Sequence, residues 1–243
     1  LCRLHNTFYI WHLFRSKRCI MGKKVLFGSP IYSYDVDNTS YDKEKVMSHI
    51  LDNYKIDKYR NAWDNESNMH HSYDDWSNIK FNNSDDVNRN ILLPVYEKLI
   101  KNFFSEKLKL NKKTNYAFEI INYTCFGDSQ YMKPHNHLPD YIFTCIHYLQ
   151  FDPTQHAGIR LFNNSDYGSY ARHLFPTYYD TVNTLEDDNS FMFEYFDYTP
   201  KEDEMIIFNG MLPHAVPKQK NTTKPRISVV TNIEILPENK ENA

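Results

Sequence analysis

The chain has 243 residues, of which 41% are hydrophobic and 24% charged, and its formal net charge is -3. This composition is typical of a globular protein long enough to bury a core, and it excludes a disordered or collagen-like chain. No apolar run approaches the roughly 20 residues of a membrane-spanning helix, and the acidic balance argues against a nucleic-acid duplex as partner. Four cysteines without a C-x-x-C pair favour a reducing compartment, so we expect a cytoplasmic protein without a disulfide scaffold.

Residues 1–20 are interpreted as an N-terminal extension. A short apolar patch precedes Arg15, Lys17 and Arg18, whereas a secretory signal peptide places its charges before its apolar region. An amphipathic membrane anchor is the alternative for this stretch. Residues 237–243 are interpreted as a C-terminal tail.

The next part of the chain predicts a strand and two helices. Residues 24–34 are rich in β-branched and aromatic side chains and predict one or two strands. A helix capped by Ser40 should follow, because apolar residues between positions 46 and 54 recur at helical spacing. A second helix should begin near Ser84 or Pro94, where proline is tolerated only in the first turn or at a bend.

After Lys113 the apolar pattern changes from a period of 3.6 to a period of 2. Six segments then read as strands: 116–121, 141–151, 158–162, 191–198, 205–208 and 226–235. Helices followed by a run of strands imply an α+β fold, mainly β, in which the helices support one face of a sandwich or barrel. We expect residues 21–113 and 114–236 to form one domain.

Two long polar segments interrupt this pattern. Residues 57–83 are rich in Asn, Asp and Ser and predict a loop anchored by a few aromatic residues. Residues 163–190 form a polar, aromatic-rich insertion between two strands. Long loops held by a rigid scaffold often carry function, so the insertion is either a lid over a pocket or a solvated excursion.

The densest cluster of polar residues is Lys133–Asp140, between two predicted strands. In an extended segment His135 and His137 project to the same side, where two imidazoles can reach one metal ion. Two histidines in a polar loop are also often simply solvated. The pair alone therefore leaves metal binding open.

The far end of the chain adds a third histidine and an arginine. His214 begins an extended run, and in the strand from Arg226 the period of 2 places Arg226, Ser228 and Asn232 on one face. A guanidinium inside a β-barrel needs an anion, because leaving it unpaired costs several kcal/mol. A carboxylate ligand held by Arg226 and Ser228 would satisfy it, and an internal acid such as Glu119 is the alternative.

These segments together carry a family resemblance. The order His-x-His, Leu-Pro-His-x-Val and Arg-Ile-Ser-x-x-x-Asn resembles the Fe(II)- and 2-oxoglutarate-dependent oxygenase superfamily, most of all a bacterial and phage group within it. The resemblance covers residues 115–235, about half of the chain. It implies a double-stranded β-helix, a jelly-roll or cupin-like barrel with N-terminal supporting helices outside it, in which residues 114–236 are the catalytic core.

The resemblance also implies roles for individual residues. His135, His137 and His214 would be the catalytic metal ligands, Arg226 and Ser228 would bind the distal carboxylate of 2-oxoglutarate, and Tyr148 falls at a family tyrosine near that cosubstrate. The family pattern has Asp or Glu where this chain has His137. The implied metal site therefore has three neutral histidine ligands instead of two histidines and one carboxylate. Asp140 is the alternative ligand or a partner that orients His137.

The implied activity is that of a dioxygenase, an oxidoreductase that hydroxylates a C–H bond while 2-oxoglutarate becomes succinate and CO2. Its cofactors would be Fe(II) and 2-oxoglutarate, with ascorbate as reductant in vitro. Its substrate would be a peptidyl residue, with proline as one candidate, or a small molecule. No membrane partner is expected, and the compartment would be the host cytoplasm if the source is viral. The sequence leaves two other classes open: a cupin-like metal-dependent oxygenase that does not use 2-oxoglutarate, and a non-catalytic jelly-roll structural or binding module.

Overall fold

The computed structural model describes residues 28–60, 67–72, 90–108, 115–137, 141–164 and 194–236. These residues form two helices, α1 (Lys43–Ile56) and α2 (Leu93–Asn102), the second continued by a π-helical turn, η3 (Phe103–Lys107). They also form ten strands: β1 (Tyr32–Asp35), β2 (His70–His71), β3 (Tyr116–Phe126), β4 (Met132–His135), β5 (Phe143–Gln150), β6 (Ile159–Phe162), β7 (Tyr195–Tyr198), β8 (Glu204–Asn209), β9 (His214–Val216) and β10 (Arg226–Ile235).

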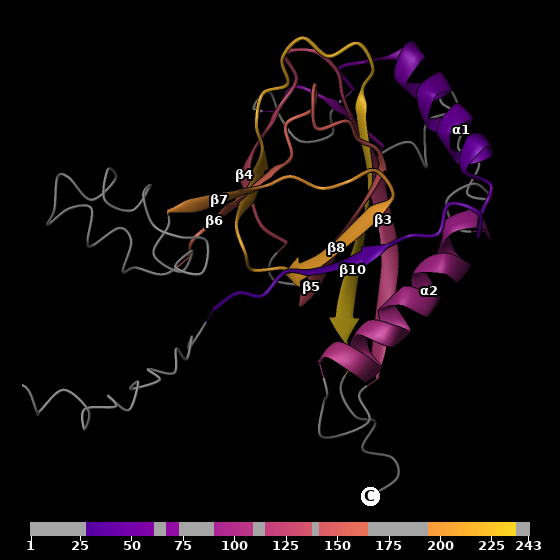
Figure 1. The fold of residues 1–243 in the computed structure, drawn as a ribbon, viewed down its shortest axis with the longest axis vertical. Coiled ribbons are helices and arrows are strands. Elements are labelled where there is room, and N and C mark those ends of the chain that lie inside the picture. The colour runs from indigo at the N-terminus through magenta and orange to yellow at the C-terminus, as the bar shows by residue number, and fades with distance from the viewer. Residues whose placement is uncertain are drawn as a thin grey trace, which may run out of the picture.

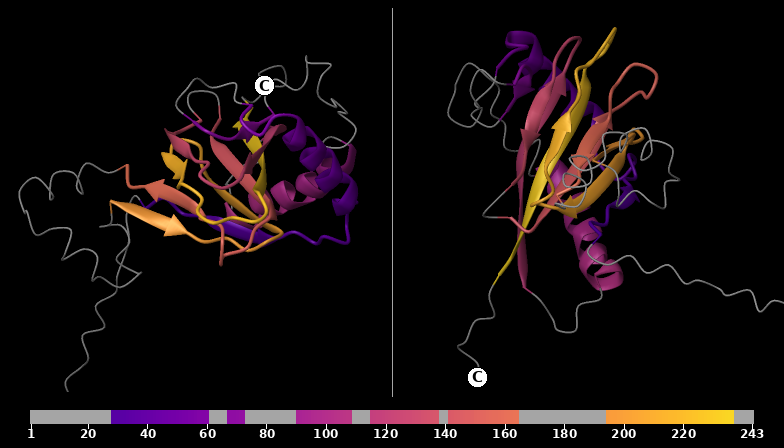
Figure 2. Two further views of the ribbon diagram at one scale, coloured as in Figure 1. Left: turned by 90° about the horizontal axis from the view of Figure 1, so that it is seen from above. Right: turned by 90° about the vertical axis from the view of Figure 1, so that its left-hand side faces the viewer.

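The strands form two antiparallel sheets. The larger has the order β1-β8-β5-β10-β3-β2, and the smaller has the order β4-β9-β6-β7. The two helices lie on one side of the larger sheet, and the smaller sheet lies on its other side (Figures 1 and 2). The larger sheet is therefore the middle layer of the molecule. Among the described residues no helix combines the length and the apolar character needed to cross a bilayer.

The largest apolar cluster lies between the helices and the larger sheet. It joins helix residues such as Ile50 and Ile100, both fully buried, to sheet residues such as Cys125, Val229 and Ile233. Burial of such side chains contributes about 1.5–3 kcal/mol each, so this layer supplies much of the stability of the fold. A second, smaller cluster lies on the opposite side of the sheet and includes Ile146, Leu161 and Phe208.

A β-bulge in β3 decides which side chains reach that opposite side. Val230 of β10 pairs with Asn122, and Thr231 pairs with Ile120, so Ile121 has no partner in the ladder. Such an extra residue shifts the alternation of the strand. Glu119 before the bulge and Asn122 after it consequently lie on the same face of the sheet, the face turned away from the helices. This face is called the inner face below.

Two expectations about local structure need correction. The first helix begins later than Ser40: Asp42 is its N-cap, because the Asp42 side chain accepts a hydrogen bond from the Lys45 amide at 3.0 Å. The polar stretch 57–83 is not all loop, since His70 and His71 form a short strand against β3. The tryptophans of that stretch lie outside the described residues.

Pro94 lies in the first turn of α2, where its missing N–H costs little.

Candidate active site

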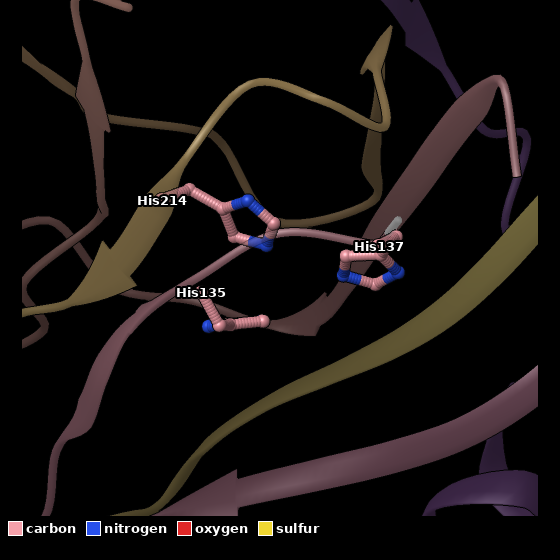
Figure 3. Close-up of side chains that lie close together, drawn as sticks. All are labelled: His135, His137 and His214. Atoms are coloured by element: carbon pink, nitrogen blue, oxygen red, sulfur yellow. The ribbon is translucent and has the colours of Figure 1, made fainter. Parts of the chain in front are cut away.

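Three histidines meet at one end of the space between the sheets (Figure 3). His135 ends β4 and His214 begins β9, and the two lie directly opposite each other in the antiparallel ladder. His137 follows β4 by two residues, and its backbone amide donates a hydrogen bond to the Gly210 carbonyl at 2.9 Å. Pairing of two short strands therefore brings together residues that are about 80 positions apart in the chain.

The hydrogen bonds of these rings set their tautomers. Nδ1 of His135 lies 3.0 Å from the Lys133 carbonyl, and Nδ1 of His214 lies 3.0 Å from the Leu212 carbonyl. In both cases a proline, Pro134 or Pro213, separates the carbonyl from the histidine.

The third ring has a side-chain partner. Nδ1 of His137 lies 2.9 Å from Asn232 Oδ1, which also accepts a hydrogen bond from the Thr144 hydroxyl at 3.2 Å. An oxygen acceptor requires the proton on Nδ1 and leaves the lone pair on Nε2. All three histidines are thus prepared as Nε2 ligands, with the second contact that metal-bound histidines commonly make.

Burial keeps the three imidazoles neutral. It lowers the pKa of His214 well below its ordinary value, and the neighbouring His135 and His137 lower it further. Burial likewise lowers the pKa of His135, and it lowers that of His137 to about 4, with His135 as the second cause. Neutral imidazole is the form that binds a metal, so no proton has to leave near neutral pH.

The spacing of the ligand atoms is close to that of a metal site. One nitrogen from each of the three rings lies within 4.8 Å of the others. Nitrogens bound to one ion at ordinary bond lengths are about 3 Å apart, so small side-chain rotations would complete the site. The ring centroids of His135 and His214 are 4.2 Å apart, and the residues fit a metal ion with three protein ligands.

A buried guanidinium lies at the other end of the same space. Arg226 is 1% exposed, and its Nε has no hydrogen-bond partner. Its Nη1 lies 3.5 Å from Ser228 Oγ, and its guanidinium carbon lies 5.0 Å from the Tyr148 ring centre and 5.1 Å from that of Phe126. Within the described part of the chain no carboxylate forms an ion pair with Arg226. Burial lowers the pKa of Arg226, while Tyr148 opposes that effect.

A row of polar side chains runs across four strands beside this guanidinium. Ser228 pairs with Tyr148 on one side and with Thr124 on the other, and Thr124 pairs with His71. The Ser228 and Thr124 hydroxyls are 2.9 Å apart. Burial raises the pKa of Tyr148 to about 12, so its hydroxyl stays protonated and can donate a hydrogen bond. The row supplies the donors that a carboxylate bound to Arg226 would use.

One pocket contains both ends of this arrangement. Its lining includes His135, His137 and His214 together with Arg226 and Ser228. The structure thus brings these predicted residues together. The Tyr148 ring contacts the Arg226 guanidinium but is not part of the pocket lining. The alternative partner for Arg226 does not apply, because Glu119 lies opposite Asn232 rather than beside the guanidinium. Asp140 lies outside the described residues.

The expected lid also falls largely outside them, because only residues 163–164 of the insertion are described. Tyr195, which follows the insertion as the first residue of β7, is described. The Arg160 guanidinium carbon lies 3.9 Å from its ring centre, and Arg160 pairs with Asp197. In β6, Arg160 lies between Ile159 and Leu161, which point into the core. Arg160 therefore points outward, and Tyr195, which it contacts, lies on the outer face of the smaller sheet.

Sequence reasoning missed several residues of the pocket. Asn122, Thr124 and His71 line it, and only the bulge at Ile121 turns the first two inward. Asn232 was noted on the correct face, but its contact with His137 was not expected. The repeated x-Pro-His of residues 133–135 and 212–214 is a signal that could have paired the two strands, whereas nothing local singles out His71.

Comparison with known proteins supports the fold. No protein-family model and no curated protein matches this sequence. Among solved structures, the chain is similar to a Pseudomonas putida prolyl-4-hydroxylase (12% identity, 85% of this chain and 93% of that one, TM-score 0.48). It is also similar to a viral collagen prolyl hydroxylase from Paramecium bursaria Chlorella virus-1 (14% identity, 85% and 96%, TM-score 0.47).

The non-heme alpha-ketoglutarate-dependent epimerase of nogalamycin biosynthesis is similar at 12% identity over 84% of this chain and 77% of that one, with a TM-score of 0.50. At this identity the likeness shows the fold, which is the double-stranded β-helix. The predicted fold class is therefore confirmed, and so, at the level of the fold, is the resemblance to 2-oxoglutarate-dependent oxygenases.

Proposed function

We propose that the protein is an Fe(II)- and 2-oxoglutarate-dependent oxygenase that hydroxylates a C–H bond of a peptidyl or small-molecule substrate. One observation carries the proposal: a single pocket holds three convergent neutral imidazoles at one end and an unpaired buried guanidinium at the other. The first arrangement suits a metal ion, and the second suits the far carboxylate of a dicarboxylate.

Each residue has a defined part in this proposal. His135, His137 and His214 hold the metal, and their Nδ1 contacts orient the rings. Arg226 and Ser228 bind the far carboxylate of 2-oxoglutarate, assisted by Tyr148. The chemistry supplied by a bound ferrous ion is the use of dioxygen: one oxygen atom enters the substrate, and the other enters succinate as 2-oxoglutarate loses CO2. The buried pocket excludes water from the reacting groups.

The three-histidine ligand set favours one second candidate, a metal-dependent oxygenase that does not use 2-oxoglutarate. Three neutral ligands leave the metal with a higher net charge than two histidines and a carboxylate do. Arg226 separates the two candidates, because only the first assigns a ligand to its guanidinium. Arg226→Ala should abolish 2-oxoglutarate turnover in the first and leave the second largely unaffected.

The test of the proposed function is uncoupled turnover. The full chain with Fe(II), ascorbate and 2-oxoglutarate should release succinate above background. His214→Ala should reduce this rate to background, because it removes the ligand that faces His135. His147→Gln is the matched control: His147 lies on the helix side of β5, where Nδ1 is 2.8 Å from the Tyr96 hydroxyl, so this variant should keep the rate. Equal background rates for wild type and His214→Ala would remove the main support for the proposal.

A further inference from the structure

A second concave feature adjoins the proposed active site. An open groove of about 450 Å³ lies where β3 begins and β10 ends. Ala117 and Glu119 of β3 and Asn232 and Glu234 of β10 line it. Glu119 pairs with Asn232, and Ala117 pairs with Glu234, so these four residues share the inner face of the sheet. They lie on the same face as Arg226 and Ser228, whereas Leu93 of α2, Phe118 and Ile120 line the groove from the helix side, so the groove reaches around the part of β3 that β2 does not cover.

Asn232 connects the groove to the three histidines. The residue is 3% exposed, and its Oδ1 is engaged by His137 and Thr144. Its Nδ2 forms no hydrogen bond with the rest of the described chain, although Asn232 lines the groove. A side-chain amide whose N–H donors are unused at the wall of a groove can donate to a ligand that brings an oxygen acceptor. One imidazole ring, that of His137, separates this amide from the other two histidines.

The charge of the groove indicates what else that ligand carries. Glu119 and Glu234 are exposed carboxylates at diagonal positions on neighbouring strands, roughly 7–8 Å apart, so one cationic group can lie close to both. No lysine or arginine is among the residues that line the groove. Leu93, Phe118 and Tyr141 add apolar and aromatic surface beside the two acids. An ammonium or guanidinium group on an aliphatic stem would match both kinds of surface.

We propose that this groove binds the prime substrate and that this substrate is cationic, with an ammonium or guanidinium group held by Glu119 and Glu234 and an oxygen acceptor on Asn232. That the bound molecule is a substrate rests on the proposed oxygenase function. The binding itself does not, since none of the groove residues named here is a proposed metal or 2-oxoglutarate ligand. A lysyl or arginyl side chain of a peptide meets the description, as does a small amine with a carbonyl or hydroxyl group.

The test compares two probes that differ only in the cation. N-acetyl-L-lysine amide and N-acetyl-L-norleucine amide are titrated into the full chain without iron or 2-oxoglutarate, and binding is followed by ligand-observed NMR. Wild type should prefer the lysine probe about fivefold, as expected for two solvent-accessible ion pairs. The double variant Glu119→Gln/Glu234→Gln should lose that preference. Glu44→Gln, which removes an exposed carboxylate from the first turn of α1, should keep it.

Two results would overturn the proposal: equal affinity of wild type for both probes, or a lysine preference that survives in the double variant. Thermal melting of each variant establishes that it is folded before binding is compared. Because the titration needs neither iron nor 2-oxoglutarate, it separates the two claims. A lysine preference without succinate formation would support cation binding in the groove and refute the oxygenase function. Succinate formation without the preference would support the oxygenase function and refute cation binding in the groove.

Discussion

The two faces of the larger sheet differ most clearly along β10. On the helix side, β10 presents Ile227, Val229 and Ile233, which are at most 1% exposed and belong to the main apolar cluster. On the inner side, the same strand presents Arg226 and Asn232, which are polar and at most 3% exposed. Alternate residues of one strand thus serve stability and ligand binding separately. Substitutions on the two faces should have different consequences.

The largest expected effect is on stability, from the helix side. Ile233→Ala should lower the free energy of unfolding by about 3 kcal/mol, because it leaves a cavity in a tightly packed layer. The affinity for 2-oxoglutarate should stay within about twofold, since Ile233 does not face the pocket. Chemical denaturation and a binding titration on the same sample measure both. A marked loss of affinity in a folded variant would show that the two faces are not independent.

Arg226→Ala should have the opposite effects, a large loss of affinity for 2-oxoglutarate and a small change in stability. The dissociation constant for 2-oxoglutarate should rise about 100-fold, the usual consequence of removing one partner of a buried charged pair. The free energy of unfolding should not fall comparably, because the variant also removes an unpaired buried charge. Isothermal titration of the metal-loaded chain gives the affinity. Arg226→Lys, which keeps the charge without the planar fork, should lie between the two, and unchanged affinity in Arg226→Ala would exclude the assigned role.

Asn232→Ala tests the residue that orients His137. Metal affinity should fall about tenfold, as for other partners of metal-binding histidines, and the absorption of bound Co(II) offers a direct measure. Asn232→Asp keeps an acceptor for the Nδ1 proton of His137 and should retain most of the affinity. If both variants bind as tightly as wild type, then the contact at 2.9 Å has no part in holding the metal.

A last expected effect, which is absent near neutral pH and grows below it, comes from buried histidines. Burial lowers the pKa of His147, on the helix side, to about 3 and that of His71, in the pocket, to about 3. Both are neutral in the folded protein, whereas in the unfolded chain they gain a proton as pH falls through about 6.5. Stability should therefore be constant above that pH and fall below it, by about 1.4 kcal/mol per pH unit for each histidine.

The difference in unfolding free energy between wild type and His147→Gln isolates one of these contributions. It should shrink as the pH of the denaturation experiment is lowered from 7.5 to 5.0. A difference that stays constant over this range would mean that His147 is already charged in the folded protein.

The sequence was sufficient for the elements that follow a clear period. The predicted strand 226–235 has the bounds observed for β10, because its alternation is uninterrupted. Where a contact between distant segments decides the local structure, sequence reasoning was insufficient. The two-residue strand β2 exists only through its pairing with β3, and the bulge at Ile121 is visible only against its partner strand. The histidines were found because their types and order carry a family pattern, whereas His71 and Asn122 carry none.

The unpaired Ile121 also has a consequence for changes in chain length. Odd-numbered positions before it and even-numbered positions after it point toward the smaller sheet. Deleting this one residue would leave a regular ladder, with Ile120 still opposite Thr231 and Asn122 still opposite Val230, so Glu119, Asn122 and Thr124 would all keep their direction. The bulge can therefore absorb the loss of one residue: the acidic groove and the arginine pocket should keep their relative facing, whereas the local bend and extra twist that a bulge adds to its strand would be lost.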